Sequence, residues 1–200
     1  WDIDVAITAS NKGLENPPGL IFMSLNENAW NFVQHSKLST YYFSFQKAKD
    51  AVVKGIGSAF TPAISLFYGM QQAIAEIRQQ GIEKIWDDHR KLADAFRKTV
   101  EFLGLKILPP NPSDSVTVIE IPVDFSANKI VTELKRKYGY IISKGQSILN
   151  DRVIRIGHLG RVDLKADAEL IAALEDVLRD SGVKLTHTNT CDYFLKYAKF

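Results

Sequence analysis

The chain has 200 residues, which is enough for one large domain, or one and a half smaller ones, with a proper hydrophobic core. Its 46% hydrophobic and 24% charged residues are typical of a soluble globular protein, and the net charge of +2 comes without a lysine or arginine block that would bind nucleic acid. No apolar run reaches the roughly 18 residues of a membrane span. The single cysteine, Cys191, excludes an internal disulfide and predicts a reducing, cytoplasmic environment.

The first predicted unit is a strand, a polar loop and a second strand. The apolar run 5–9 ends at Ser10, Asn11 and Lys12, and a loop rich in Gly and Pro leads to a second run at 20–25. In open α/β sheets, chemistry takes place beyond the carboxyl ends of the strands, so Lys12 is well placed to react. The alternative is a solvated lysine in a turn, as most lysines are.

A short helix and an aromatic segment follow. Asn26 or Asn28 is a suitable N-cap for a helix that continues to about Gln34. The segment 38–45 has no helical period and is predicted to pack in a core or an interface, because aromatic side chains dominate both. Its aromatic residues are Tyr41, Tyr42, Phe43 and Phe45. A helical turn or two is expected over 47–54.

Two long helices are predicted next. Thr61 as N-cap and Pro62 at the first helical position start an amphipathic helix that ends at Gly81, and a second helix ends at Gly104. The free N–H groups at the first helix N-terminus favour an anion, although Thr61 could equally serve only as a cap. His89 lacks a second metal-type residue four positions on, so we interpret it as a histidine at the edge of the core.

The rest of the chain predicts a compact α+β unit from about Ile82 to Leu185. Its further predicted elements are a strand at 115–121, a helix from Ser126 or Asn128 to Tyr138, two short strands at 140–143 and 153–156, and a helix that begins at Asp167.

Arg155 lies in an apolar strand, where an unpaired charge is costly. Its planar fork suits a substrate α-carboxylate, and an internal salt bridge is the alternative. His187 and Cys191 stand four residues apart in the tail, but no third metal-type residue lies nearby, so no metal site is predicted.

Four segments in chain order resemble the class V aminotransferases, specifically the alanine–glyoxylate and serine–pyruvate group of pyridoxal-phosphate (PLP) fold type I. They are Ser10-Asn11-Lys12-Gly13-Leu14 with Pro17-Pro18-Gly19-Leu20, then Phe60 to Leu66, Gly81-Ile82-Glu83 with Trp86 and His89-Arg90, and Ile154 to Gly160. The resemblance runs from about Asp4 to about Leu185. It departs at Asn11, where the family usually has glutamine, and after Thr186.

The resemblance implies an α/β fold that comprises the end of a PLP fold type I large domain, residues 1–81, and a small C-terminal α+β domain with a tail, residues 82–200. Because the chain opens with Trp1 and enters an apolar strand at once, we expect it to be the C-terminal part of a longer protein. The missing part would be the first half of the PLP domain.

The resemblance also implies the roles of the candidate residues. Lys12 would be the catalytic lysine that holds PLP as a Schiff base and, once released, moves a proton on the substrate. Ser10 and Asn11 would contact the cofactor, although a serine at a strand end is more often a turn residue and asparagine is one methylene shorter than the family glutamine. His158 would be a hydrogen-bonding neighbour rather than an acid or base, and Arg155 would bind the substrate carboxylate.

The aromatic segment and the loop before the long helix would lie at the interface of a homodimer, with Ser58 and Thr61 reaching the phosphate of the partner's PLP. The implied activity is transamination between alanine or serine and glyoxylate or pyruvate. One alternative is a cysteine desulfurase or lyase on the same fold, which would need a reactive cysteine on a mobile loop and usually a histidine before the lysine. The other is a non-catalytic dimerisation module.

Overall fold

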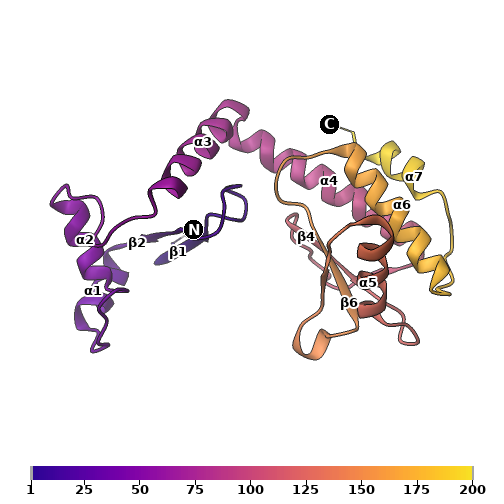
Figure 1. Ribbon diagram of the computed structural model, residues 1–200, viewed down its shortest axis with the longest axis horizontal. Coiled ribbons are helices and arrows are strands. Elements are labelled where there is room, and N and C mark those ends of the chain that lie inside the picture. The colour runs from indigo at the N-terminus through magenta and orange to yellow at the C-terminus, as the bar shows by residue number, and fades with distance from the viewer. Residues whose placement is uncertain (1, 200) are drawn as a thin grey trace. The chain divides into compact units, whose positions relative to one another are not determined.

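The computed structural model describes residues 2–199, and Figure 1 shows their helices and strands. The described chain forms two compact units that divide between Gln79 and Gln80. The elements of the first unit are β1 (Val5–Ala9), β2 (Ile21–Leu25), α1 (Glu27–His35), α2 (Phe45–Val53) and α3 (Ile64–Gln80).

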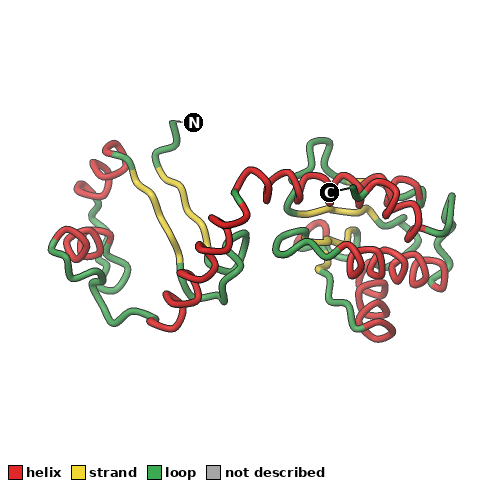
Figure 2. The backbone as a smooth tube through the Cα atoms, turned by 90° about the horizontal axis from the view of Figure 1, so that it is seen from above, coloured by secondary structure: helices red, strands yellow, loops and turns green. Residues whose placement is uncertain are grey.

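Strands β1 and β2 form an antiparallel pair in which Val5 lies opposite Leu25 and Ala9 lies opposite Ile21. The two strands run side by side in Figure 2. The predicted strand, loop and second strand are confirmed, and Ile7 is exposed within this unit. A short apolar run fixes neither the direction of its partner nor its burial, because both depend on what packs against it.

Two of the three helices of this unit, α1 and α2, begin at a residue whose side chain caps the helix N-terminus. The Asn26 side chain accepts a hydrogen bond from the Ala29 N–H at 2.9 Å, and Ser44 caps α2 by accepting from Lys47. The expected start of α3 was wrong, because Thr61 does not cap it. The helix begins at Ile64, whose N–H donates to the Pro62 carbonyl, so the chain remains non-helical through Ala63.

The second unit contains a four-stranded antiparallel sheet in the order β3-β4-β6-β5. Its strands are β3 (Lys106–Ile107), β4 (Val116–Glu120), β5 (Ser143–Lys144) and β6 (Val153–Gly157). Its helices are α4 (Ile82–Phe102), α5 (Ala127–Tyr138), α6 (Leu164–Asp180) and α7 (Thr190–Tyr197), with a 3-10 turn at Ser147–Leu149.

One face of this sheet is covered by helices and forms the core. Alternate residues of each strand point to opposite faces, so Thr117 and Ile119 of β4 are buried while Val116 and Val118 are only half-buried. The fully buried core side chains come from every helix of the unit and from both central strands; the largest are Phe96, Leu103, Ile119, Ile130, Leu134, Ile154, Ile171, Leu174, Leu178 and Phe194.

The predicted helix 126–138 is confirmed, with Ser126 as its N-cap and Gly139 at its end with φ of 75°. The predicted start of α6 at Asp167 was wrong: the helix begins at Leu164, because Asp163 accepts hydrogen bonds from the N–H groups of Lys165 and Ala166. In place of the strand expected at 140–143, the structure has the two-residue strand β5 at Ser143–Lys144.

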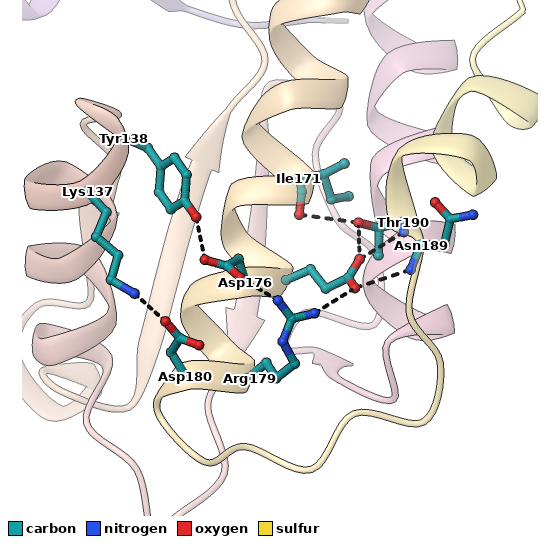
Figure 3. Close-up of polar contacts among 9 residues, drawn as sticks. Lys137, Tyr138, Ile171, Asp176, Arg179, Asp180, Asn189 and Thr190 are labelled. Atoms are coloured by element: carbon teal, nitrogen blue, oxygen red, sulfur yellow. Dashed lines mark hydrogen bonds and ion pairs between the residues drawn. The ribbon is translucent and has the colours of Figure 1, made fainter.

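Two further elements were not predicted. Strand β3 has only two residues, too few for an alternating pattern. Helix α7 lies in the polar tail and packs against α4 and α6. Glu175 of α6 accepts hydrogen bonds from the Thr190 N–H at 2.9 Å and from the Thr190 hydroxyl at 2.8 Å, which satisfies the start of α7 from another helix. Figure 3 shows Thr190 and Asn189 at this junction.

Candidate functional site

Hydrogen bonds between residues of the loop itself hold the conformation of the loop that carries Lys12. The buried Ser10 hydroxyl donates to the Pro17 carbonyl at 2.7 Å and accepts from the Leu20 N–H at 3.3 Å. A backbone bond from the Glu15 N–H to the Lys12 carbonyl, 2.9 Å, forms the turn itself. The loop is therefore ordered while the side chains of Lys12 and Asn11 remain exposed. Within the described residues the Lys12 amine has no hydrogen bond or ion pair.

A second set of contacts ties this loop to α3. Asn16 is buried, and its side-chain amide donates to the Leu66 carbonyl at 3.1 Å. A Cβ placed on Gly69 would lie 2.4 Å from the Asn16 Oδ1, so any larger residue there would have to displace the Asn16 side chain. Gly19, with φ of +136°, likewise approaches the Leu66 side chain, where a Cβ would lie 2.6 Å from Cδ1. Sequence reasoning missed Asn16, and the glycine within the α3 pattern was the available signal.

Ser58 and Thr61 line one hollow of about 270 Å³ in the first unit. The Ser58 hydroxyl donates to the Phe60 carbonyl at 2.6 Å, whereas the exposed Thr61 hydroxyl has no hydrogen-bonding partner among residues 2–199. The hollow also takes in Gly19 and Leu20, the end of the Lys12 loop, but Lys12 itself does not line it. Two of the predicted cofactor residues therefore meet at one site, with the start of α3 beside them.

The predicted aromatic segment packs on Phe60 and is otherwise open. The rings of Tyr41 and Tyr42 lie 5.5 Å and 4.9 Å from that of Phe60, and the Lys47 amine lies 4.0 Å from the Tyr41 ring centre. Tyr41 is 76% exposed and Phe43 80% exposed. These contacts hold the segment beside the Ser58 loop without burying it, which is typical of a surface that is covered by another chain.

Arg155 lies on β6, opposite Val118 of β4 and Ser143 of β5. Its side chain is half-buried on the sheet face that the helices do not cover. The guanidinium Nε donates to the Lys144 carbonyl at 3.1 Å. In the described chain no carboxylate pairs with Arg155, so the internal salt bridge that was the alternative interpretation is absent there.

His158 follows β6 and points into the core, with only 3% of its surface exposed. Its Nε2 lies 2.7 Å from the Thr117 hydroxyl oxygen, and its ring centre lies 5.2 Å from that of Phe96. Burial above all, and then the positive charges of Arg97 and His89, lower the pKa of His158 to about 4. The imidazole is therefore neutral near pH 7, which excludes a charged role. The expected hydrogen-bonding role is confirmed, and its partner Thr117 was missed.

The other candidate histidines have structural contacts. The half-buried His89 ring places Nε2 3.0 Å from the Gly160 carbonyl, as expected for a histidine at the edge of the core. His187 stacks on Phe102 at 4.4 Å rather than pairing with Cys191. Across residues 2–199, no group of three or more metal-type side chains could hold a metal ion.

Comparison with known proteins decides the family. The family model described as aminotransferase class-V matches residues 1–165. The chain belongs to the class-V aminotransferases. The structure is mixed α/β and resembles the class-V aminotransferase fold.

Two curated relatives and one solved structure illustrate the relationship. The chain is 30% identical to the L-aspartate–glyoxylate aminotransferase of Paracoccus denitrificans over 92% of its length and 47% of the relative. It is 32% identical to the serine–glyoxylate aminotransferase of Methylorubrum extorquens over 93% and 48%. The crystal structure of ureidoglycine–glyoxylate aminotransferase from Bacillus subtilis superposes with a TM-score of 0.90 at 21% identity, over 98% of this chain and 52% of that one.

This class-V chain thus spans about half the length of the curated relatives it matches. Both of those relatives are aminotransferases by name. Among the helices of the described part, none combines the length and hydropathy needed to cross a membrane.

Proposed function

We propose that the intact protein is a PLP-dependent aminotransferase that moves an amino group from a small amino acid, alanine or serine, to a 2-oxo acid, glyoxylate or pyruvate. The observation that carries the proposal is Lys12, an exposed amine without a partner among residues 2–199, at the end of β1 on a loop that Ser10 and Asn16 hold in place. A reactive lysine must be free to bond and yet fixed in position, and this loop meets both needs.

The residues present fit PLP. Lys12 would bind the cofactor covalently, and after release its amine would carry the proton to and from the substrate Cα. PLP, when bound, supplies the electron sink for the reaction. Asn11, exposed beside Lys12, can offer an amide to the cofactor. Ser10 has its hydroxyl engaged within the loop, so its contribution would be to orient the lysine.

We place the phosphate contacts at Ser58 and Thr61, on the hollow beside the start of α3. The Thr61 hydroxyl, free among the described residues, is a suitable phosphate ligand, and the Ser58 hydroxyl would become one on leaving the Phe60 carbonyl. The exposed aromatic segment beside them supports a homodimer in which these residues serve the partner's cofactor. On this proposal the first unit is the end of a large PLP domain and the second is the small C-terminal domain, in a cytoplasmic enzyme.

Arg155 would bind the α-carboxylate that every amino-acid and 2-oxo-acid substrate carries. Its Nε is already engaged with the Lys144 carbonyl, which orients the guanidinium, and no internal carboxylate competes in the described residues. A guanidinium offers two parallel N–H donors to a carboxylate, a geometry that lysine lacks. This role accounts for a half-buried charge that has no counter-ion in the described part of the chain.

The test is amino transfer by the purified intact protein supplied with PLP. Glycine should form from glyoxylate, or alanine from pyruvate, with matching loss of the amino donor. Release of sulfide from cysteine without amino transfer would instead show a desulfurase. Failure to retain PLP at all would show a non-catalytic module.

A further inference from the structure

The residues Arg155 and His158 lie on opposite faces of the same strand end. In the register of β4 and β6, Val118 is opposite Arg155 and Thr117 is opposite Ile156. Ile154, Ile156 and Thr117 are buried on the core face, whereas Arg155 is half-buried on the open face. His158 continues the core-facing alternation two residues beyond Ile156. Because His158 and Arg155 belong to one continuous backbone segment, a shift of His158 also moves the strand that carries Arg155.

His158 is held to the neighbouring strand by two hydrogen bonds. Its N–H donates to the Ser115 carbonyl at 2.9 Å, and its ring Nε2 shares a hydrogen bond of 2.7 Å with the Thr117 hydroxyl. The other ring nitrogen, Nδ1, is buried without a partner in the described chain. The Thr117 hydroxyl is thus the one polar side-chain partner of this buried imidazole among those residues.

Support for Arg155 from the other side of β6 is limited. Strand β5 pairs with β6 only through Ser143 and Lys144, opposite Arg155 and Ile154. Beyond Arg155, toward the end of the strand, the ladder bonds of β6 come from β4 alone. The hydrogen bond between Thr117 and His158 lies in this stretch, so a small displacement of His158 would also displace the Arg155 guanidinium.

We infer that Thr117 and His158 form a positioning pair that holds the Arg155 guanidinium where a substrate carboxylate can bind it. The inference rests on the proposed role of Arg155. Neither residue contacts substrate, since both lie on the buried face of the sheet. A neutral imidazole suits this task, because it fixes the strand end without adding a second positive charge that would compete for the carboxylate.

The experiment compares threonine variants in the intact, PLP-loaded enzyme. Thr117→Val removes the hydroxyl, and Thr117→Ser keeps it. Thr99→Val is a matched control, because Thr99 is also fully buried in the second unit but its hydroxyl donates to the Ala95 carbonyl within α4. Each variant is made alone and together with Arg155→Lys. The readouts are KM for the amino acid, kcat, the cofactor absorption spectrum and the melting temperature.

Thr117→Val should raise KM about three- to tenfold, the range that loss of one hydrogen bond typically gives, with kcat and spectrum unchanged. Thr117→Ser should stay close to the parent. Thr99→Val should lower the melting temperature without changing KM. In the Arg155→Lys background, Thr117→Val should add little further rise in KM, because the two changes act through one contact.

An unchanged KM in Thr117→Val, or an equal rise with and without Arg155→Lys, would overturn the inference. If Arg155→Lys alone leaves KM unchanged, the proposed role of Arg155 is wrong, and the pair then has no guanidinium to position. Should Thr117→Val fail to fold, His158→Gln, which keeps a nitrogen for Thr117, and His158→Leu, which does not, repeat the comparison with the same expected order.

Discussion

The Asn16 side-chain amide donates a hydrogen bond to the Leu66 carbonyl at 3.1 Å, and this bond joins the Lys12 loop to helix α3. Residues 50 positions apart in the chain are thereby held in fixed relation. Since Asn16 is buried, removal of either side of the contact leaves a polar group without a partner.

Gly69→Ala should destabilise the protein by about 1–3 kcal/mol, because its Cβ would lie 2.4 Å from the Asn16 Oδ1. In an Asn16→Ala background the same change should be neutral or stabilising, since the clash is gone and alanine is the better helix residue by about 1 kcal/mol. Denaturant unfolding of the parent, the two single variants and the double variant measures these changes in the free energy of unfolding. Equal effects of Gly69→Ala in both backgrounds would show that Asn16 does not occupy that space.

Arg155→Lys should raise KM for the amino acid by roughly thirtyfold, or about 2 kcal/mol, because a point charge cannot replace the guanidinium fork. The cofactor spectrum should not change. Arg152→Lys is a suitable control, because Arg152 is exposed and lies 3.6 Å from Glu120. An unaltered KM in Arg155→Lys together with a lower melting temperature would indicate a purely structural arginine.

The buried His158 predicts a pH dependence of stability. Its pKa in the folded protein is about 4, below the ordinary value of 6.5, so the unfolded chain takes up the proton first as the pH falls. The contribution of the neutral His158 to the free energy of unfolding is complete above pH 6.5 and is lost between pH 6.5 and 4. It amounts to about 3 kcal/mol. Urea unfolding at several pH values should show that the free energy of unfolding of the parent decreases as the pH falls through this range. The slope should be shallower in His158→Gln. Identical slopes would contradict the burial of a neutral imidazole.

The proposed dimer predicts complementation between inactive variants. One variant carries Lys12→Ala, and the other carries Ser58→Ala and Thr61→Ala. If the phosphate contacts cross a two-fold interface, a hybrid dimer contains one site with both lesions and one with neither, so up to half of its sites should be active. Two differently tagged Lys12→Ala proteins serve as the control. Subunit exchange without recovered activity would place these contacts within one subunit.

Local signals predicted most of the elements, and the misses are of two kinds: the local cap at Asp163 and contacts between residues far apart in the chain. Asn26 and Ser126 lie directly before apolar periodic segments, so capping located α1 and α5. Helix α7 begins after Asn189, a residue type that commonly caps helices, but the Thr190 N–H is satisfied by Glu175, 15 residues earlier in the chain. Thr117 acquires its role from a histidine 41 residues away. Lys12 and Arg155 could be proposed as site residues because a motif surrounds each, whereas Asn16 and Thr117 make their contacts with residues far away in the sequence.

The most direct measurement of the central claim is the attachment site of the cofactor. The intact protein is incubated with PLP, reduced with borohydride, digested and analysed by peptide mass spectrometry, beside Lys12→Ala and the exposed-lysine control Lys54→Ala. The account predicts a stable phosphopyridoxyl group on Lys12 in the parent and in Lys54→Ala, and none in Lys12→Ala. A label on another lysine, or no label in the parent, would contradict it.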